Sequence, residues 1–219
     1  MRAPRYEFED RRRSLVMNRA SGSVVLSLFA LMLCGCGSTK PIHYYTIQPA
    51  TAPVLSTGAQ SVSLQVARIS GAEFLRGTPI AYRVGANEIG TYEFSRWVEP
   101  PVELVQINLI HALKSTGNYT SVDTVGSSSE GQYLVRGRLF DFEEVDGPTI
   151  VGLVSMEFEL YDHKSGKVVW SHSYSQAEPV GSKDMSAVVG ALNANLDRGL
   201  KETAAGLNEY FSSKSSGKS

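Results

Sequence analysis

The hydrophobic and polar positions of the chain follow two periods, one typical of strands and one typical of helices. Alternating, β-branched or aromatic runs predict strands over residues 43–47, 62–66, 79–84, 88–94, 119–125, 133–144, 150–162 and 168–177. Apolar residues spaced by three and four predict two helices. One follows Pro100 and Pro101 and ends near Gly117, and the other covers residues 184–211.

The connections between these elements indicate how they pack. Gly85-Ala86-Asn87 separates two predicted strands, and glycine and asparagine favour a hairpin turn. The last three strands are joined by residues 146–148 and 163–167, short glycine-containing segments that imply antiparallel neighbours. Each helix has one apolar stripe, which would pack on the sheet. The pattern predicts an α/β (α+β) single domain with a mixed, mostly antiparallel sheet and two main helices packed on it.

Residues 1–35 have the pattern of a secretory signal rather than of a folded domain. A basic region around Arg12 precedes an apolar run over residues 24–32, about half of the roughly 20 residues that a membrane-spanning helix needs. The run leads into Leu33-Cys34-Gly35-Cys36, in which a small residue precedes a cysteine. This arrangement is typical of a lipobox. We therefore predict a lipoprotein signal peptide over residues 1–35 and lipid attachment at Cys36.

Two alternatives concern the same segment. Attachment at Cys34 would place the bulky Leu33 at the cleavage position, which accepts small side chains. An ordinary signal peptide would leave Cys36 unmodified. A separate alternative concerns the start of translation, because Met17-Asn18-Arg19 is a more usual beginning for a signal than residues 1–16.

Cleavage before Cys36 would leave about 184 residues, enough for one domain with an ordinary core. We expect a lipidated N-terminus, first strand and loop over residues 36–60, a folded domain over residues 41–211 and a disordered tail over residues 212–219. The mature chain would have no free thiol for a disulfide, for cysteine catalysis or for a metal. Its net charge of −1 gives no basis for nucleic-acid binding, which needs a basic surface.

Acylation also predicts the location of the protein. A diacylglycerol and an N-acyl group (palmitate) on Cys36 would give stable attachment, since one acyl chain alone binds membranes only marginally. Gly37 follows the cysteine, whereas the usual inner-membrane retention signal is an aspartate at this position. We expect a lipid-anchored protein on the periplasmic face of the outer membrane, with the inner membrane as the less favoured alternative.

The residue pattern offers little for catalysis. The four histidines lie in different predicted elements, without the spacing of metal ligands: His43, His111, His163 and His172. There is no Gly-x-Ser-x-Gly nucleophile motif and no glycine-rich phosphate loop. Four acidic residues gather at one strand end, where a solvated rim is the simpler interpretation: Asp141, Glu143, Glu144 and Asp146. We expect no enzymatic activity, no metal and no cofactor beyond the acyl groups.

Large apolar side chains in two places favour a contact with a partner. Phe74 and Leu75 lie in a predicted loop, where exposed apolar groups indicate an interface unless the loop packs on the core. Arg96 and Trp97 lie between the predicted hairpin and the first helix, where a packing anchor is the alternative to a partner or lipid contact. We predict that these four residues contribute to an interface.

The succession of short motifs resembles one family across the mature chain. The lipobox is followed by Tyr44-Tyr45-Thr46-Ile47, Phe74-Leu75-Arg76, Tyr82-Arg83, Asn87-Glu88-Ile89 and the block over residues 96–101. This order resembles the ABC-type transport auxiliary lipoproteins, the PqiC-like family. One departure lies at Leu75-Arg76, where the family tends to have an acidic residue between Leu and Arg.

The resemblance implies a non-catalytic component of a Mce-type lipid transport system. In such systems an ABC permease and ATPase supply energy, and Mce-domain proteins form a hydrophobic conduit across the periplasm. The auxiliary lipoprotein docks the end of the conduit at the outer membrane. The resemblance thus implies a Mce-domain protein as direct partner, the permease and ATPase as indirect partners, and assembly into a homo-oligomeric ring.

Two other functions are alternatives to this one. A lipid- or solute-binding carrier lipoprotein would need its own large apolar cavity. An envelope hydrolase is disfavoured by the missing nucleophile and metal motifs.

Overall fold

A computed structural model of the chain describes residues 40–48, 60–127 and 131–216. The chain divides into two units, Met1–Pro41 and Ile42–Ser219, and the second contains the sheet and the helices discussed below. The predicted signal peptide and Cys36 lie outside the described residues. So does most of the predicted loop between the first two strands.

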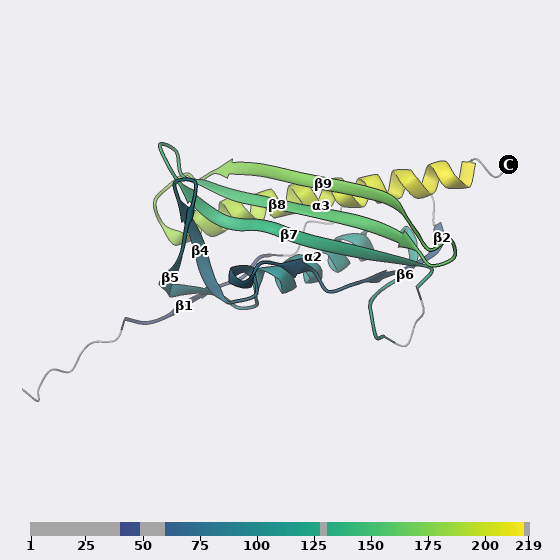
Figure 1. Ribbon diagram of the computed structural model, residues 1–219, viewed down its shortest axis with the longest axis horizontal. Helices are drawn as coiled ribbons and strands as arrows, with labels where there is room; N and C mark the ends of the chain where they lie inside the picture. Colours follow the sequence, from purple (N-terminus) through teal and green to yellow (C-terminus); the bar gives the residue numbers. More distant parts are fainter. Residues whose placement is uncertain (1–39, 49–59, 128–130, 217–219) are drawn as a thin grey trace, which may run out of the picture. The chain divides into compact units, whose positions relative to one another are not determined.

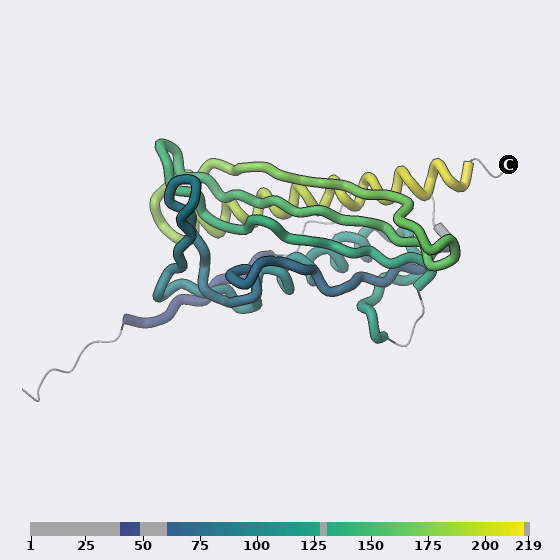
Figure 2. The backbone as a smooth tube through the Cα atoms, in the orientation of Figure 1, coloured from purple at the N-terminus to yellow at the C-terminus, as the bar shows by residue number. Residues whose placement is uncertain are grey.

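One mixed sheet contains all the strands of the described part. Its longest strands are β7 (Tyr133–Asp146), β8 (Val151–Asp162) and β9 (Lys167–Pro179), which pair antiparallel in this order. Figure 2 shows the three strands running side by side. A hairpin of β4 (Pro79–Val84) and β5 (Glu88–Trp97) has Gly85 in its turn, with a φ of 63° that favours glycine. The predicted hairpin is therefore confirmed.

The shorter strands pair in parallel. Three of them lie along successive parts of β7, namely β2 (Gln60–Val66), β3 (Ser70–Gly71) and β4. Strand β6 (Tyr119–Thr124) is parallel to β2, and β1 (His43–Tyr45) is parallel to the last residues of β5. The predicted α+β class with a mixed sheet is confirmed, and the antiparallel pairs β7–β8 and β8–β9 have the longest registers.

Both helices lie on the same side of the long strands, behind the sheet in Figure 1. Helix α2 (Pro101–Ser115) begins directly after Pro100, where a proline has no helical hydrogen bond to lose. Glu103 in its first turn and Lys114 in its last turn complement the helix dipole. The apolar stripe predicted for this helix is buried in the core.

Helix α3 (Met185–Ser216) packs on β8 and β9 through buried residues that recur every three or four positions along one face. Its fully buried Asn195 ties the helix to both strands. The side-chain Nδ2 of Asn195 donates to Gly152 O at 2.9 Å and to Gln176 O at 2.6 Å, while its Oδ1 accepts from Tyr174 Oη at 2.6 Å. Packing and satisfied polar groups therefore hold α3 on the sheet.

Three boundaries differ from the sequence prediction. Helix α3 continues to Ser216, so the predicted disordered tail is wrong for residues 212–216. Strand β1 ends at Tyr45 instead of residue 47, and β5 continues to Trp97. Arg96 and Trp97 are thus strand residues that alternate across the sheet. Within the described ranges, no helix is both long enough and apolar enough to cross a membrane.

Candidate functional site

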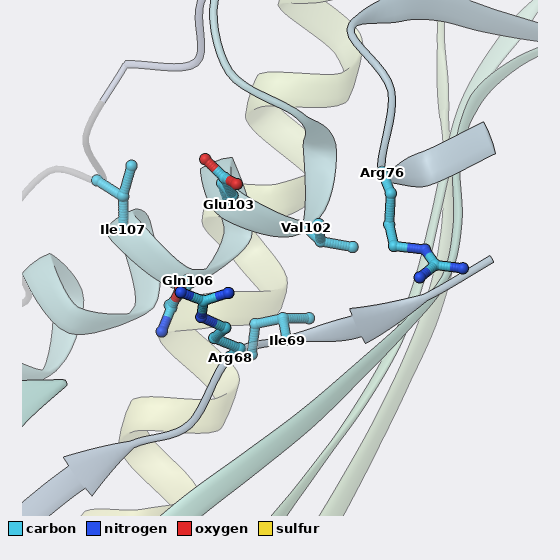
Figure 3. Close-up of a pocket in the computed structure, with 7 residues that line it drawn as sticks. All are labelled: Arg68, Ile69, Arg76, Val102, Glu103, Gln106 and Ile107. Carbon is cyan, nitrogen blue, oxygen red and sulfur yellow. The ribbon is translucent and has the colours of Figure 1, made fainter. Parts of the chain in front are cut away.

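An open groove of about 440 Å³ lies beside the first turns of α2, and we call it the α2 groove. Figure 3 shows the residues that line it: Arg68, Ile69, Arg76, Val102, Glu103, Gln106 and Ile107. They come from the connection between β2 and β3, from the residue after the short 3-10 helix η1 (Glu73–Leu75), and from α2. The groove thus lies where two neighbouring segments of the chain meet the later helix α2.

Close packing fixes these segments to one another. Gln106 Nε2 donates to Ala67 O at 3.1 Å, which holds the β2–β3 connection against α2. A Cβ atom on Gly71 would lie 2.8 Å from Val102 Cγ1 and 3.4 Å from Leu75 Cβ, so only glycine lets strand, helix and η1 approach this closely. Ile69 and Val102 are buried in the groove, while Ile107 is 54% exposed. The groove therefore has a rigid apolar floor and an accessible apolar wall.

Charged groups flank this apolar centre. Figure 3 shows the guanidinium groups of Arg68 and Arg76 on either side of Ile69 and Val102. Arg76 Nη2 lies 2.6 Å from Glu73 Oε2, but both side chains are exposed and such pairs contribute little stability. Glu103 adds a carboxylate from α2. This mixture of charges with apolar surface suits a protein segment of mixed character better than a purely apolar or purely anionic molecule.

The structure separates the four predicted interface residues into two buried and two partly exposed side chains. Leu75 and Trp97 are completely buried. The Trp97 ring packs on Phe142 with 5.3 Å between ring centroids. Neither side chain can contact a partner, which corrects the prediction for these two residues: the loop and the strand end both pack onto the core.

Phe74 and Arg96 are partly exposed, and their role in an interface stays a prediction. Phe74 packs against the edge of the core cluster, next to Leu75 in η1. Arg96 lies in β5 opposite Tyr44 of β1. Lipid attachment at Cys36 also stays a prediction, because that residue lies outside the described ranges.

The acidic residues near the end of β7 form a structural cluster. Arg83 Nε lies 2.5 Å from Glu143 Oε1, and Arg83 Nη2 lies 3.1 Å from Asp141 Oδ1. Burial raises the pKa of Glu143, and the Arg83 bridge partly opposes this. Tyr92 Oη donates to Glu144 Oε2 at 2.8 Å. The interpretation as a solvated rim is wrong for Glu143 and Glu144, which are buried because β4 and β5 pack beside the strand end.

Neither this cluster nor the α2 groove has the residues of a metal centre. In the part of the chain that the structure describes, no group of three His, Cys, Asp or Glu side chains could hold a metal ion.

The sequence profile of the ABC-type transport auxiliary lipoprotein component family matches residues 45–204. The chain belongs to this family. The family resemblance seen in the sequence is thereby confirmed over most of the folded unit, from β1 into α3. A comparison with curated proteins finds no match.

Solved structures share the fold at low sequence identity. A Xanthomonas campestris protein assigned to family DUF330 is 20% identical, with a TM-score of 0.72, and the match covers 80% of this chain and 99% of that one. A protein described only as uncharacterized is 14% identical, with a TM-score of 0.60 and coverages of 76% and 98%. The PelC dodecamer protein of Paraburkholderia phytofirmans is 16% identical, with a TM-score of 0.44 and coverages of 72% and 96%. The first two show the fold.

None of the four predicted interface residues lines the α2 groove. One signal was present in α2 itself: Ile107 lies between the buried positions Val105 and Leu109, on the opposite face of the helix. An apolar residue on the polar face of an amphipathic helix is a candidate for contact. No comparable signal identified Arg68 or Arg76, because single arginines on a surface are common.

Proposed function

We propose that this protein is a non-catalytic, membrane-anchored component of a Mce-type ABC transport system. It docks the end of a periplasm-spanning lipid conduit at the outer membrane, to which acyl groups on Cys36 attach it. The observation that carries the proposal is the family match over residues 45–204, which places the chain among the transport auxiliary lipoproteins. A Mce-domain protein is the direct partner, and the permease and ATPase join through it.

The α2 groove supports docking over carriage. Small-molecule sites are mostly apolar and enclose most of their ligand, whereas charged or amide side chains make up four of the seven residues that line this open groove. Apolar Ile107 and the flanking charges instead offer the combination found at protein interfaces, with an apolar centre and a polar rim. We assign the groove to a segment of the Mce-domain partner.

A homo-oligomeric ring is part of the same proposal. A heterologous contact that repeats around an axis closes into a ring. Strand β9 offers a suitable surface, because it pairs only with β8 among the described strands and leaves a 13-residue edge. Unpaired strand edges are templates for another chain. The ring would place several α2 grooves around the end of one conduit.

A pull-down from detergent-solubilised membranes tests the proposal. The tagged, acylated protein is compared with Cys36→Ala, with Ile107→Glu in the groove, and with Val125→Glu as the matched control. Val125 is 57% exposed and Ile107 is 54% exposed, so the two substitutions have similar costs in the free chain. Recovery of a Mce-domain protein should fall about tenfold or more with Ile107→Glu, as for a residue at the centre of an interface.

The outcomes separate the competing functions. Mce protein, permease and ATPase recovered with the parent protein and with Val125→Glu, but not with Ile107→Glu, support docking through the groove. Loss with Cys36→Ala shows that the anchor is needed for assembly. Lipid recovered without any Mce protein favours the carrier. Recovery of neither lipid nor transporter proteins contradicts both functions.

A further inference from the structure

The outer face of the sheet has an exposed apolar patch beside β1, and we call its four residues the Tyr44 patch: Ile42, Tyr44, Arg96 and Val98. Ile42 is 45% exposed, Tyr44 63% and Val98 53%. Tyr44 pairs directly with Arg96 across the parallel strands β1 and β5. Because side chains alternate along a strand, all four point away from the core-facing Tyr45 and Trp97.

The patch is held rigidly although it lies at a sheet edge. Val98 N–H donates to Tyr45 O at 2.8 Å, which continues the β1–β5 ladder beyond Trp97. The adjacent Trp97 is fully buried against Phe142. Both helices pack on the opposite side of the sheet (Figure 1), so neither covers these residues. Three large apolar side chains are thus fixed in an exposed position.

Arg96 gives the patch its chemical character. Its guanidinium is in no salt bridge with any residue that the structure describes. A cation surrounded by tyrosine and aliphatic side chains matches the membrane interface, where phosphates lie above glycerol and acyl groups. Tyrosine is enriched at that depth, and arginine can bind a phosphate while its stem stays in apolar surroundings.

The position of the patch along the chain selects the membrane as its occupant. Five residues lie between Cys36 and Ile42, so the chain takes six residue steps from one to the other. An extended chain of six steps spans at most about 20–22 Å. An acylated Cys36 would therefore keep the patch within this distance of the lipid surface. Strand β6 is labelled at the other end of the sheet from β1 in Figure 1, and the exposed Val125 comes directly after it in the sequence.

We propose that the Tyr44 patch lies against the headgroups of the membrane that holds the acyl anchor. Arg96 binds a phospholipid phosphate there, while Ile42, Tyr44 and Val98 enter the interface. The proposal rests on lipidation at Cys36, which is part of the proposed function. Its consequence is that β1 faces the membrane and the outer face of the sheet tilts toward it, so the anchor fixes the orientation of the domain as well as its location.

Lipid quenching of a fluorescent probe tests this orientation. The mature acylated chain would have no free thiol, so Thr46→Cys next to the patch and Thr124→Cys at the end of β6 each provide one labelling site of the same original residue type. Both positions are exposed. The labelled proteins are reconstituted in vesicles of phosphatidylethanolamine and phosphatidylglycerol that carry a headgroup nitroxide. We expect quenching at position 46 and little at position 124.

Variants then test the patch itself. In the Thr46→Cys protein, Arg96→Gln should lower the ratio of docked to undocked protein about fivefold, the effect expected for one arginine near an anionic surface. Tyr44→Ser should lower it as well. Arg138→Gln, an exposed arginine of β7 with the same change in net charge, should have no effect. Thermal unfolding of each variant checks that the fold is intact.

Failure of the patch and failure of the anchor give different results. Protein that floats with the vesicles but shows equal quenching at both positions, or quenching unaffected by Arg96→Gln and Tyr44→Ser, overturns the patch and leaves the anchor in place. Protein that does not float with the vesicles overturns lipidation at Cys36 and, with it, the patch. Selective quenching at position 46 that both variants reduce supports the proposal.

Discussion

Replacing Trp97 distinguishes a core residue from an interface residue. The side chain is fully buried and packs on Phe142, and truncation of such a tryptophan to alanine typically costs about 3–5 kcal/mol. Part of this cost is offset, because the buried indole Nε1 has no hydrogen-bond partner among the described residues. Removing this unpaired donor removes a desolvation penalty of about 1 kcal/mol or more. We therefore expect Trp97→Ala to lower the free energy of unfolding by about 3 kcal/mol.

A second substitution isolates the effect of the indole nitrogen. Trp97→Phe retains an aromatic ring against Phe142 and removes the unpaired N–H. We expect its free energy of unfolding to stay within about 1 kcal/mol of the parent value. The smaller ring loses packing contacts, which destabilises the fold, while removal of the unpaired N–H removes a desolvation penalty, which stabilises it. Val98→Ala, at a 53% exposed position next in the chain, serves as the control and should change stability by less than about 0.5 kcal/mol.

Urea unfolding followed by far-UV circular dichroism measures these differences without relying on tryptophan fluorescence. For a domain of this size, about 3 kcal/mol corresponds to a fall in Tm of roughly 6–12 °C. An unchanged unfolding midpoint for Trp97→Ala would refute the assignment of Trp97 to the core. Loss of partner binding at unchanged stability would instead restore the original prediction that Trp97 is an interface residue.

Two further predictions concern α3 and the acidic cluster. Gly199→Ala should destabilise by about 1–3 kcal/mol, because its Cβ would lie 2.7 Å from Cδ1 of the buried Tyr174 ring. Gly190→Ala, with no neighbouring atom within 4 Å, should stabilise the protein by about 0.5–1 kcal/mol. If thermal unfolding shows the same change in stability for both glycine variants, the close packing of α3 on the sheet at Gly199 is contradicted. Burial raises the pKa of Glu143 above its ordinary value of 4.5, so its stabilising effect is complete below pH 4.5 and is lost as pH rises through the raised value. The free energy of unfolding of the parent protein, relative to that of Glu143→Gln, should therefore fall as pH rises. If urea unfolding shows the same difference between the two proteins at every pH, the raised pKa of the buried Glu143 carboxyl is contradicted.

Most elements of the fold could be predicted because their periodicity reflects burial on one face. The stripes of α2 and α3 and the alternation in β8 correspond to residues that the structure buries. The parallel pairings of β7 with β2, β3 and β4 could not be assigned in the same way. Alternation indicates which face of a strand is buried, but does not identify the strand beside it.

Burial of the predicted site residues was harder to foresee. Leu75 and Trp97 each lie at the end of a short or regular element, where the alternation of apolar and polar residues does not indicate which side is buried. Their burial depends on segments distant in the sequence: β4 and β7 pack on the 3-10 helix that contains Leu75, and Phe142 packs on Trp97. The carboxylates Glu143 and Glu144 looked solvated for the same reason. Arg83 and Tyr92, which bind them, come from a hairpin more than fifty residues earlier in the chain.

The segment that links β5 to α2 connects the two proposed surfaces. Within residues 96–106, Arg96 belongs to the Tyr44 patch, Trp97 is buried in the core, and Gln106 lines the α2 groove. The chain from Arg96 to Gln106 joins the two surfaces directly, and the buried Trp97 anchors this segment in the core. A partner bound in the groove would therefore have a set orientation relative to the membrane that we propose for the patch. In this proposal the buried Trp97 would contribute to docking without touching the partner, because it helps to keep the two proposed contact surfaces in a fixed relative position.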